Sequence, residues 1–459
     1  MFLNKKAAWL FSFAVGTAAM LLLHAPDAPR VNLFWFGTMT AIGVFAFDLL
    51  PTFATAVILL LFYVVTGVSD PGTVFNGWLS PIIWLCMCGM LIGRLMEKSR
   101  LAERIALLTI SRIATSPVRL YLACLAAGFA VGSIVPDMIT VILIFMAIAS
   151  GMCGSLNLDR NSKAASTLVM AVYLGANISG AAFLPNNIGL PGLIMVKDMG
   201  VPFSWLEFLA ENLPFQLIHA LIAFTILHLF GGKELGRLIA DCREKAASDL
   251  RALGPVGASE KKILLLALLA LIAFMTESLH GIPGFYAFCS VVMLGFTPIF
   301  GLLESSDLGK VQFHLLFFIA GCMAIGTVAA SLGLPAWLAQ KLLPVLDGIA
   351  CGPIISLLAY WTGVLVNMLL TPMAAATSLS APIAQIAADL GLSIKPVLYS
   401  FLYGLDQFIL PYELTPALIM FSTGYVRMRY LMTIMALRLV CVSLAVLVVS
   451  AFVWPLMGL

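Results

Sequence analysis

Two similar stretches, one in each half of the chain, decide how the fold is interpreted. The first is Leu184-Pro185-Asn186-Asn187-Ile188-Gly189-Leu190-Pro191-Gly192-Leu193-Ile194-Met195, and the second is Leu410-Pro411-Tyr412-Glu413-Leu414-Thr415-Pro416-Ala417-Leu418-Ile419-Met420. Allowing a one-residue gap, both read Leu-Pro, a few polar residues, Pro, a small residue and Leu-Ile-Met. Proline lacks the N–H donor and clashes with the preceding turn, so two closely spaced prolines interrupt a helix. Each stretch therefore predicts a broken helix within a long apolar segment. Matching breaks in two halves of a chain are typical of a transporter's binding site, whereas ordinary proline kinks are the simpler alternative.

The composition predicts an all-α polytopic membrane protein. The chain has 459 residues, of which 62% are hydrophobic and 10% are charged, whereas a soluble protein carries about 25% charged residues. The length accommodates roughly a dozen spans of about 20 residues each. The net charge of +3 comes from basic residues scattered between apolar runs, so no nucleic-acid partner is expected. We expect the protein to lie in the bilayer of a bacterial inner membrane.

The apolar runs follow the same order in both halves. The expected units are the N-terminal spans at 1–50, a first repeat at 51–230, a polar linker at 231–261 and a second repeat at 262–459. Two runs are too long for one span and are interrupted, near Pro136 and near Pro372, so each predicts a re-entrant hairpin, at about 118–152 and about 350–390. The broken helices are expected at 164–198 and 396–424.

The distribution of lysine and arginine predicts the orientation. If the N-terminus is cytoplasmic and both hairpins return to their own side, about 11 spans result, and most basic residues fall on the cytoplasmic side, including those of the linker 231–261. The two hairpins then open to opposite sides. The halves would therefore be inverted repeats, as in many secondary transporters.

One further stretch carries a resemblance to a known family. Residues Ser80-Pro81-Ile82-Ile83-Trp84-Leu85, continuing to Glu97-Lys98-Ser99-Arg100-Leu101, resemble the span before the first hairpin of the divalent-anion/sodium symporters, the dicarboxylate, citrate and sulfate carriers of the ion-transporter superfamily. The resemblance implies two hairpins opening from opposite sides, two broken helices, a homodimer and an elevator-type movement. The family's Ser-Asn-Thr hairpin tips are replaced here by Pro136-Asp137-Met138 and about Pro372-Met373-Ala374.

Three acidic residues are candidates for ion coupling. Asp137, at the expected tip of the first hairpin, is the position where the resemblance implies a sodium ligand, and it could equally carry a proton or cap a helix. Glu413 lies within the second break and has the same alternatives. Asp406 lies seven residues earlier and could instead belong to a packed helix face.

The candidate substrate-binding residues are polar, glycine and proline positions at the breaks and tips. They are Asn177, Ser179, Asn186, Asn187, Gly189, Pro191, Thr371, Pro372, Thr377, Tyr412, Thr415 and Pro416. Such side chains can also satisfy freed backbone groups or mediate helix packing. No lysine or arginine lies at either break or tip, so an anion would be held by the N-termini of half-helices.

The predicted function is secondary active transport of a small anion, such as a di- or tricarboxylate or sulfate, coupled to a sodium or proton gradient. A coupled carrier or antiporter of a different solute is the alternative within transport, because three acidic residues near the site also suit a cationic substrate. A channel or membrane receptor is the alternative of another class. The sequence has no nucleotide-binding loop and no nucleophile–base pattern, so we expect neither an enzyme nor a cofactor other than a sodium ion.

Overall fold

The fold is all-helical over the residues that the structure, a computed structural model, describes. These are residues 5–23, 28–47, 49–133, 135, 138–160, 162–184, 186, 188–311, 313–334, 337, 351–368 and 370–459. No β-strand occurs within these ranges. The prediction of an all-α membrane fold is therefore confirmed.

The helices of the first half are α1 (Lys5–Leu22), α2 (Pro29–Ala46), α3 (Thr52–Val65), α4 (Pro71–Val74), α5 (Pro81–Ser99), α6 (Leu101–Ile113), α7 (Pro117–Gly132), α8 (Met138–Ser155), α9 (Lys163–Ala181), α10 (Gly189–Met195) and α11 (Trp205–Ala252). Those of the second half are α12 (Ala258–Met275), α13 (Glu277–His280), α14 (Gly284–Met293), α15 (Ser305–Leu308), α16 (Phe313–Ser331), α18 (Gly352–Asn367), α19 (Pro372–Asp389), α20 (Ile394–Leu405), α21 (Thr415–Ser422), α22 (Met428–Val448) and α23 (Trp454–Leu456). Short 3₁₀ or π turns lie at Asn76–Leu79, Lys197–Met199, Leu294–Phe296, Pro411–Glu413 and Val449–Val453.

Two interruptions between successive helices fall within the stretches quoted above. The first separates α9 from α10, and the second separates α20 from α21. Both long interrupted runs are also divided, into α7 with α8 and into α18 with α19. Three described helices, α9, α11 and the α22–α23 segment, are long and apolar enough to cross a membrane, and six further apolar helices are shorter. Shorter helices are the expected consequence of dividing long apolar runs into half-length pieces.

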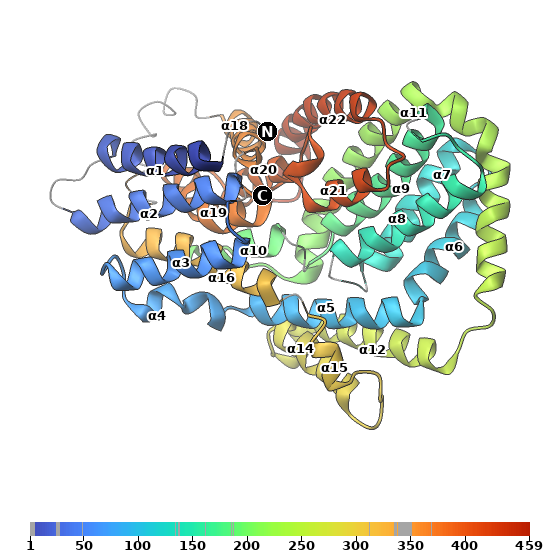
Figure 1. Cartoon of the computed structure of the whole chain (residues 1–459), viewed down its shortest axis with the longest axis horizontal. Helices are drawn as coiled ribbons and strands as arrows, with labels where there is room; N and C mark the ends of the chain where they lie inside the picture. Colours follow the sequence, from blue (N-terminus) through green and yellow to red (C-terminus); the bar gives the residue numbers. More distant parts are fainter. Residues whose placement is uncertain are drawn as a thin grey trace.

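The two halves interlock at their breaks. In Figure 1, α10 and α21 lie near the centre of the molecule, between α19 on one side and α8 on the other. Helix α8 of the first half packs on α21 of the second, and α19 of the second half packs on α10 of the first. The short helix after each break therefore packs on a helix from the other half. This brings the interruptions between α7 and α8, α9 and α10, α18 and α19, and α20 and α21 close together.

Close glycine contacts recur at equivalent positions in the halves. A Cβ added to Gly128 of α7 would overlap the carbonyl of Gly175 in α9, and a Cβ added to Gly404 of α20 would overlap the carbonyl of Tyr360 in α18. Small residues at helix crossings let backbones approach closely in membrane proteins. In each half, a glycine contact therefore holds the helix before the break against the first helix of the interrupted run: α9 against α7, and α20 against α18.

The polar segment 231–261 is more helical than expected. The sequence interpretation treats it as a loop, but α11 continues without interruption to Ala252 and runs along one edge of the molecule (Figure 1). Its composition favours helix, with Lys245 paired to Asp249 one turn later at 2.7 Å. Only residues 253–257 separate α11 from α12.

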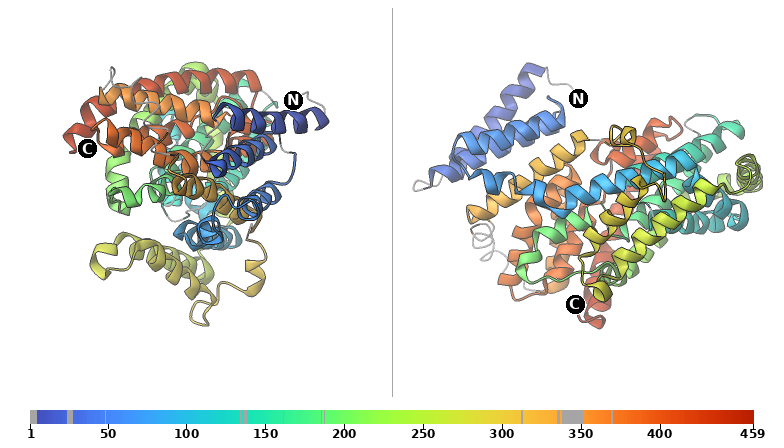
Figure 2. Two further views of the ribbon diagram at one scale, coloured as in Figure 1. Left: turned by 90° about the vertical axis from the view of Figure 1, so that its left-hand side faces the viewer. Right: turned by 90° about the horizontal axis from the view of Figure 1, so that it is seen from below.

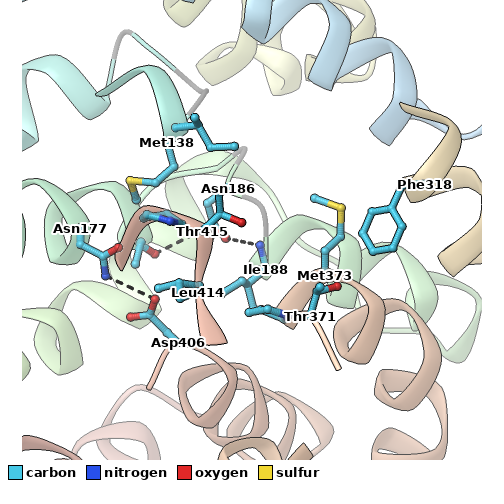
Figure 3. A pocket seen from close by; sticks show the side chains of 14 residues that line it. Met138, Asn177, Asn186, Ile188, Phe318, Thr371, Met373, Asp406, Leu414 and Thr415 are labelled. Atoms are coloured by element: carbon cyan, nitrogen blue, oxygen red, sulfur yellow. Dashed lines mark hydrogen bonds between the residues drawn. The ribbon is translucent and has the colours of Figure 1, made fainter. Parts of the chain in front are cut away.

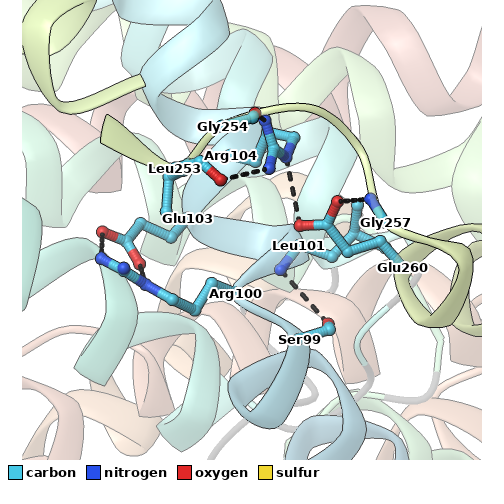
Figure 4. A network of polar contacts seen from close by, with 9 residues as sticks. All are labelled: Ser99, Arg100, Leu101, Glu103, Arg104, Leu253, Gly254, Gly257 and Glu260. Atoms are coloured by element: carbon cyan, nitrogen blue, oxygen red, sulfur yellow. Dashed lines mark hydrogen bonds and ion pairs between the residues drawn. The ribbon is translucent and has the colours of Figure 1, made fainter. Parts of the chain in front are cut away.

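A polar joint links this connection to α6 (Figure 4). Arg100, in the left-handed region with φ 58°, separates α5 from α6. The Arg104 guanidinium donates to the carbonyls of Leu253 and Gly254 at 3.2 and 2.8 Å and pairs with Glu260 at 3.2 Å. The start of α6 is therefore tied to the segment that connects the two halves.

The remaining helices form an outer layer. Helices α1 and α2 pack on each other at one end of the molecule, and α12, α14 and α15 lie beneath α5 (Figures 1 and 2). Helix α16 packs on both α3 and α19, and α14 packs on α5. The outer layer thus reaches the central helices chiefly through α16 and α5.

Candidate functional site

A pocket of about 140 Å³ lies where the interrupted helices of both halves end (Figure 3). It is lined by Met138, Ile139, Asn177, Ala181, Asn186 and Ile188 from the first half, and by Phe318, Thr371, Pro372, Met373, Asp406, Leu414, Thr415 and Pro416 from the second. Since an engineered cavity of about 150 Å³ binds benzene, this volume suits a solute of roughly six to eight non-hydrogen atoms.

Several helix ends converge on this pocket. Helices α8, α19 and α21 begin there, at Met138, Pro372 and Thr415, and α9 ends there at Ala181. The first N–H groups of a helix have no partner within the helix and carry a partial positive charge. Three N-termini from both halves therefore create a favourable environment for an anion, although none of the described lining residues is basic.

Asn186 holds the first break open. Its side-chain oxygen accepts the N–H groups of Ile188 and Gly189 at 3.1 and 2.5 Å, and its amide donates to the Phe183 carbonyl at 2.8 Å. The side chain thereby satisfies backbone groups at the end of α9 and at the start of α10. It also lines the pocket, and its hydrogen bonds match the second alternative that the sequence left open, the satisfaction of freed backbone groups.

Asp406 is the charged residue among the described lining residues, and it faces α9. It follows the last residue of α20, and its Oδ1 accepts a long hydrogen bond of 3.4 Å from the Asn177 amide (Figure 3). The side-chain oxygen of Asn177 in turn accepts a hydrogen bond of 3.4 Å from the Tyr173 hydroxyl. This contact joins the broken helices of the two halves within the pocket wall.

Two threonines mark the start of second-half helices. Thr371 caps α19, where its hydroxyl accepts the Ala374 N–H at 3.4 Å, and Pro372 occupies the first helical position. Helix α21 begins at Thr415, and Pro416 lies in its first turn, where proline is favoured because no N–H donor is needed there. Both hydroxyls are therefore at the pocket because the helices begin there.

A second, smaller cavity of about 30 Å³ shares Asp406, Asn186 and Ile188 with the pocket. Beyond it, Lys395 at the start of α20 contacts Glu207 and Glu211 of α11 at 2.5 and 2.7 Å. The Tyr399 hydroxyl donates to the other oxygen of Glu211 at 2.5 Å. We call these four residues the α11–α20 clamp; it fixes the helix that ends at Asp406.

Several other candidates lie outside the pocket wall. Ser179 donates to the Leu125 carbonyl of α7 and to the Gly175 carbonyl, so its hydroxyl joins two packed helices, whereas Thr377 donates to the Met373 and Ala374 carbonyls of its own helix. Pro191 is buried in α10, and Gly189 lines the smaller cavity.

Glu413 satisfies backbone donors in the second break. Its carboxylate accepts the N–H groups of Ile409 and Leu410 at 3.3 and 3.0 Å. Pro136, Asp137, Pro185 and Asn187 lie outside the described residues, as does the side chain of Tyr412. Within the part of the chain that the structure describes, no three His, Cys, Asp or Glu side chains are grouped as a metal site.

The structure adds residues that the sequence interpretation missed. Phe318 of α16 and the apolar wall residues gave no distinguishing signal, because they sit in uniformly apolar runs. The α11–α20 clamp joins residues that are far apart in the sequence, such as Glu211 and Tyr399, which are 188 positions apart. Arg438 of α22 could have been found from the sequence, because an isolated charge within an apolar membrane segment suggests a functional residue.

Comparison with known sequences assigns a family. The sequence profile described as "Citrate transporter" matches residues 42–404. The chain belongs to the citrate transporter family. The profile covers α9 and nearly all of α20, the helices that precede the two breaks, and most of the helices that form the pocket. It confirms the general expectation of an anion-transporter family.

Individual relatives of this citrate transporter family member are distant. A membrane protein of Cupriavidus necator is 24% identical over 59% of this chain and 53% of its own length. An uncharacterised transporter of Methanocaldococcus jannaschii is 25% identical over 61% and 62%. An L-tartrate/succinate antiporter of Escherichia coli is 22% identical over 76% and 74%. The chain thus spans little more than half the length of the first of these relatives.

Proposed function

We propose that the protein is a secondary carrier that moves a small carboxylate across the membrane. The observation that carries the proposal is the convergence of three helix N-termini, from α8, α19 and α21, on one pocket without a described basic residue. Such ends bind carboxylates through free N–H groups and the helix dipole. Membership of the citrate transporter family and the similarity to a tartrate/succinate antiporter support the same substrate class.

Counterflow in proteoliposomes tests this function. Vesicles containing the purified protein would be loaded with unlabelled succinate, tartrate, citrate or sulfate and diluted into labelled succinate. We expect carboxylate on the inside to accelerate uptake of label, because a carrier must return with its site reoriented. A channel gives no such acceleration, and absence of acceleration with every internal anion would refute the proposal.

Exchange without net ion coupling is the second candidate, favoured by the name of the Escherichia coli relative. The two candidates differ in vesicles that contain no internal anion. A coupled symporter accumulates label when an inward sodium or proton gradient is imposed, whereas an obligatory exchanger does not. A carrier of a different solute would give no uptake of labelled succinate under either condition.

The coupling ion is proposed to act at the acidic residues of the site. Asp137, next to the pocket residue Met138, is the proposed position of a sodium ion or a transported proton, with Asp406 and Glu413 as the other candidates. We expect Asp137→Asn to abolish gradient-driven uptake while exchange at equal gradients survives. Full uptake with unchanged sodium and pH dependence would assign Asp137 to helix capping.

The transport movement is proposed to be of elevator type, within a homodimer in a bacterial inner membrane. The crosswise packing of α8 on α21 and α19 on α10 supports movement of the central helices as one body against the outer layer. A cysteine cross-link between α16 and α19 should block transport, whereas one between α8 and α21 should not. Cross-linking in membranes measures the oligomeric state.

A further inference from the structure

A buried arginine lies behind the pocket. Arg438 of α22 has no solvent exposure. Its guanidinium carbon lies 5.1 Å from the centre of the Phe408 ring, which covers one face of the group. Among the described residues, none accepts a hydrogen bond from its Nε, Nη1 or Nη2. Burying a guanidinium is unfavourable unless a counter-charge compensates it, and a cation–π contact offsets only part of this cost.

Groups from four elements lie within electrostatic range of this guanidinium, and its contact residue Phe408 lies two positions after one of them, Asp406. They interact with it electrostatically and are Tyr173 of α9, His219 of α11, Tyr360 of α18 and Asp406 at the end of α20. The Tyr360 hydroxyl donates to the Leu439 carbonyl at 2.8 Å. Asp406 is the carboxylate of this set, and its visible hydrogen bond to Asn177 is long, at 3.4 Å.

Two buried acceptors beside Asp406 and Phe408 are also left without donors in the described structure. They are the side-chain oxygens of Asn367 and Gln407. The Asn367 amide is anchored in the same region, because it donates to the Gln407 carbonyl at 2.7 Å. The interior behind the pocket therefore combines a cation that has no hydrogen bond to a described residue, two free acceptors and one carboxylate.

We propose that Arg438 is the fixed positive charge of the anion site and acts through Asp406. The guanidinium neutralises the Asp406 carboxylate from behind, so that a carboxylate substrate can enter a pocket whose described charged residue is acidic. This inference rests on the proposed function and identifies a residue that sets the charge selectivity of the site. Arg438 is a positioning residue, because it does not line the pocket itself.

The proposal makes a prediction with two opposite signs. Arg438→Gln leaves Asp406 uncompensated and should raise the KM for succinate by about 30-fold, which corresponds to about 2 kcal/mol, because like charges in the site then repel. Asp406→Asn leaves Arg438 uncompensated and should lower that KM. The charge-neutral double variant Arg438→Gln/Asp406→Asn should return the KM to within about threefold of the wild-type value. Arg438→Lys should stay within about fivefold, because the charge is kept.

The measurement is succinate counterflow in proteoliposomes at a series of concentrations, normalised to folded protein. A merely structural role for Arg438 would reduce the maximal rate without moving KM in opposite directions in the two single variants. If Arg438→Gln does not fold, Asp406→Asn against the double variant still gives the sign. KM values unchanged, or shifted in the same direction by both single substitutions, would overturn the proposal for Arg438 alone. Absence of counterflow by the wild-type protein would overturn the proposed function and this inference with it.

Discussion

The α11–α20 clamp gives the sharpest stability prediction. Lys395 is replaced by methionine, which preserves the length and apolar stem of the side chain but removes the ammonium. Glu211, whose side chain is only 9% exposed, then loses its positive partner, whereas Glu207, at 39% exposure, can be hydrated. The loss therefore falls on Glu211.

The magnitude follows from the burial of Glu211. Removing one partner of a buried ion pair costs about 3 to 5 kcal/mol. We expect the lower end, about 3 kcal/mol, because the Tyr399 hydroxyl still donates to the Glu211 carboxylate. For a chain of this size that corresponds to a fall of about 3 °C in Tm, measured by thermal unfolding in detergent.

Two variants make the result interpretable. Lys395→Met/Glu211→Gln removes both charges and keeps an oxygen that accepts from Tyr399, so most of the lost stability should return. Lys245→Met is the matched control, since its pair with Asp249 is 32% and 34% exposed and should contribute little. An unchanged Tm in Lys395→Met, or no recovery in the double variant, would refute the assignment of a buried, coupled pair.

Four further outcomes are expected. Asn186→Ala should cost about 1 to 2 kcal/mol of stability and most of the counterflow rate, because it removes the acceptor for two N–H groups at the first break; equal counterflow would contradict this. Gly404→Ala should destabilise by about 1 to 3 kcal/mol in thermal unfolding, since its Cβ would overlap a neighbouring helix backbone. Burial acts to raise the pKa of Asp307, but hydrogen bonds and the charge of Lys98 outweigh it and hold this pKa below its ordinary value. The resulting stabilisation is present at neutral pH and should be lost as the pH falls below about 4. Asp307→Asn should abolish that part of the acid dependence of Tm. Ser248→Cys, in a background without other reactive cysteines, should resist an impermeant thiol reagent added outside intact cells if the linker is cytoplasmic; ready labelling would reverse the orientation.

The sequence by itself determined the class of fold and the positions of the interruptions. Composition predicts a membrane protein, and prolines interrupt backbone hydrogen bonding at the two quoted stretches, so the ends of α9 and α20 and the starts of α10 and α21 follow from local chemistry. The same local rules identified Asn186 as a polar residue at a break and Thr371 as one at a hairpin tip. These features depend on the backbone of a few neighbouring residues and need no tertiary contact.

Only the tertiary structure decided which of these residues share a site. The crosswise packing of the two halves brings Asn177 to Asp406, 229 positions later in the sequence, and the packing of α9 on α7 pairs Ser179 with the Leu125 carbonyl. No local pattern distinguishes these outcomes, because each residue is a polar group on an otherwise apolar helix. The counter-charge of Arg438 is likewise a property of long-range packing: a buried guanidinium is compensated by whichever groups four separate helices place around it.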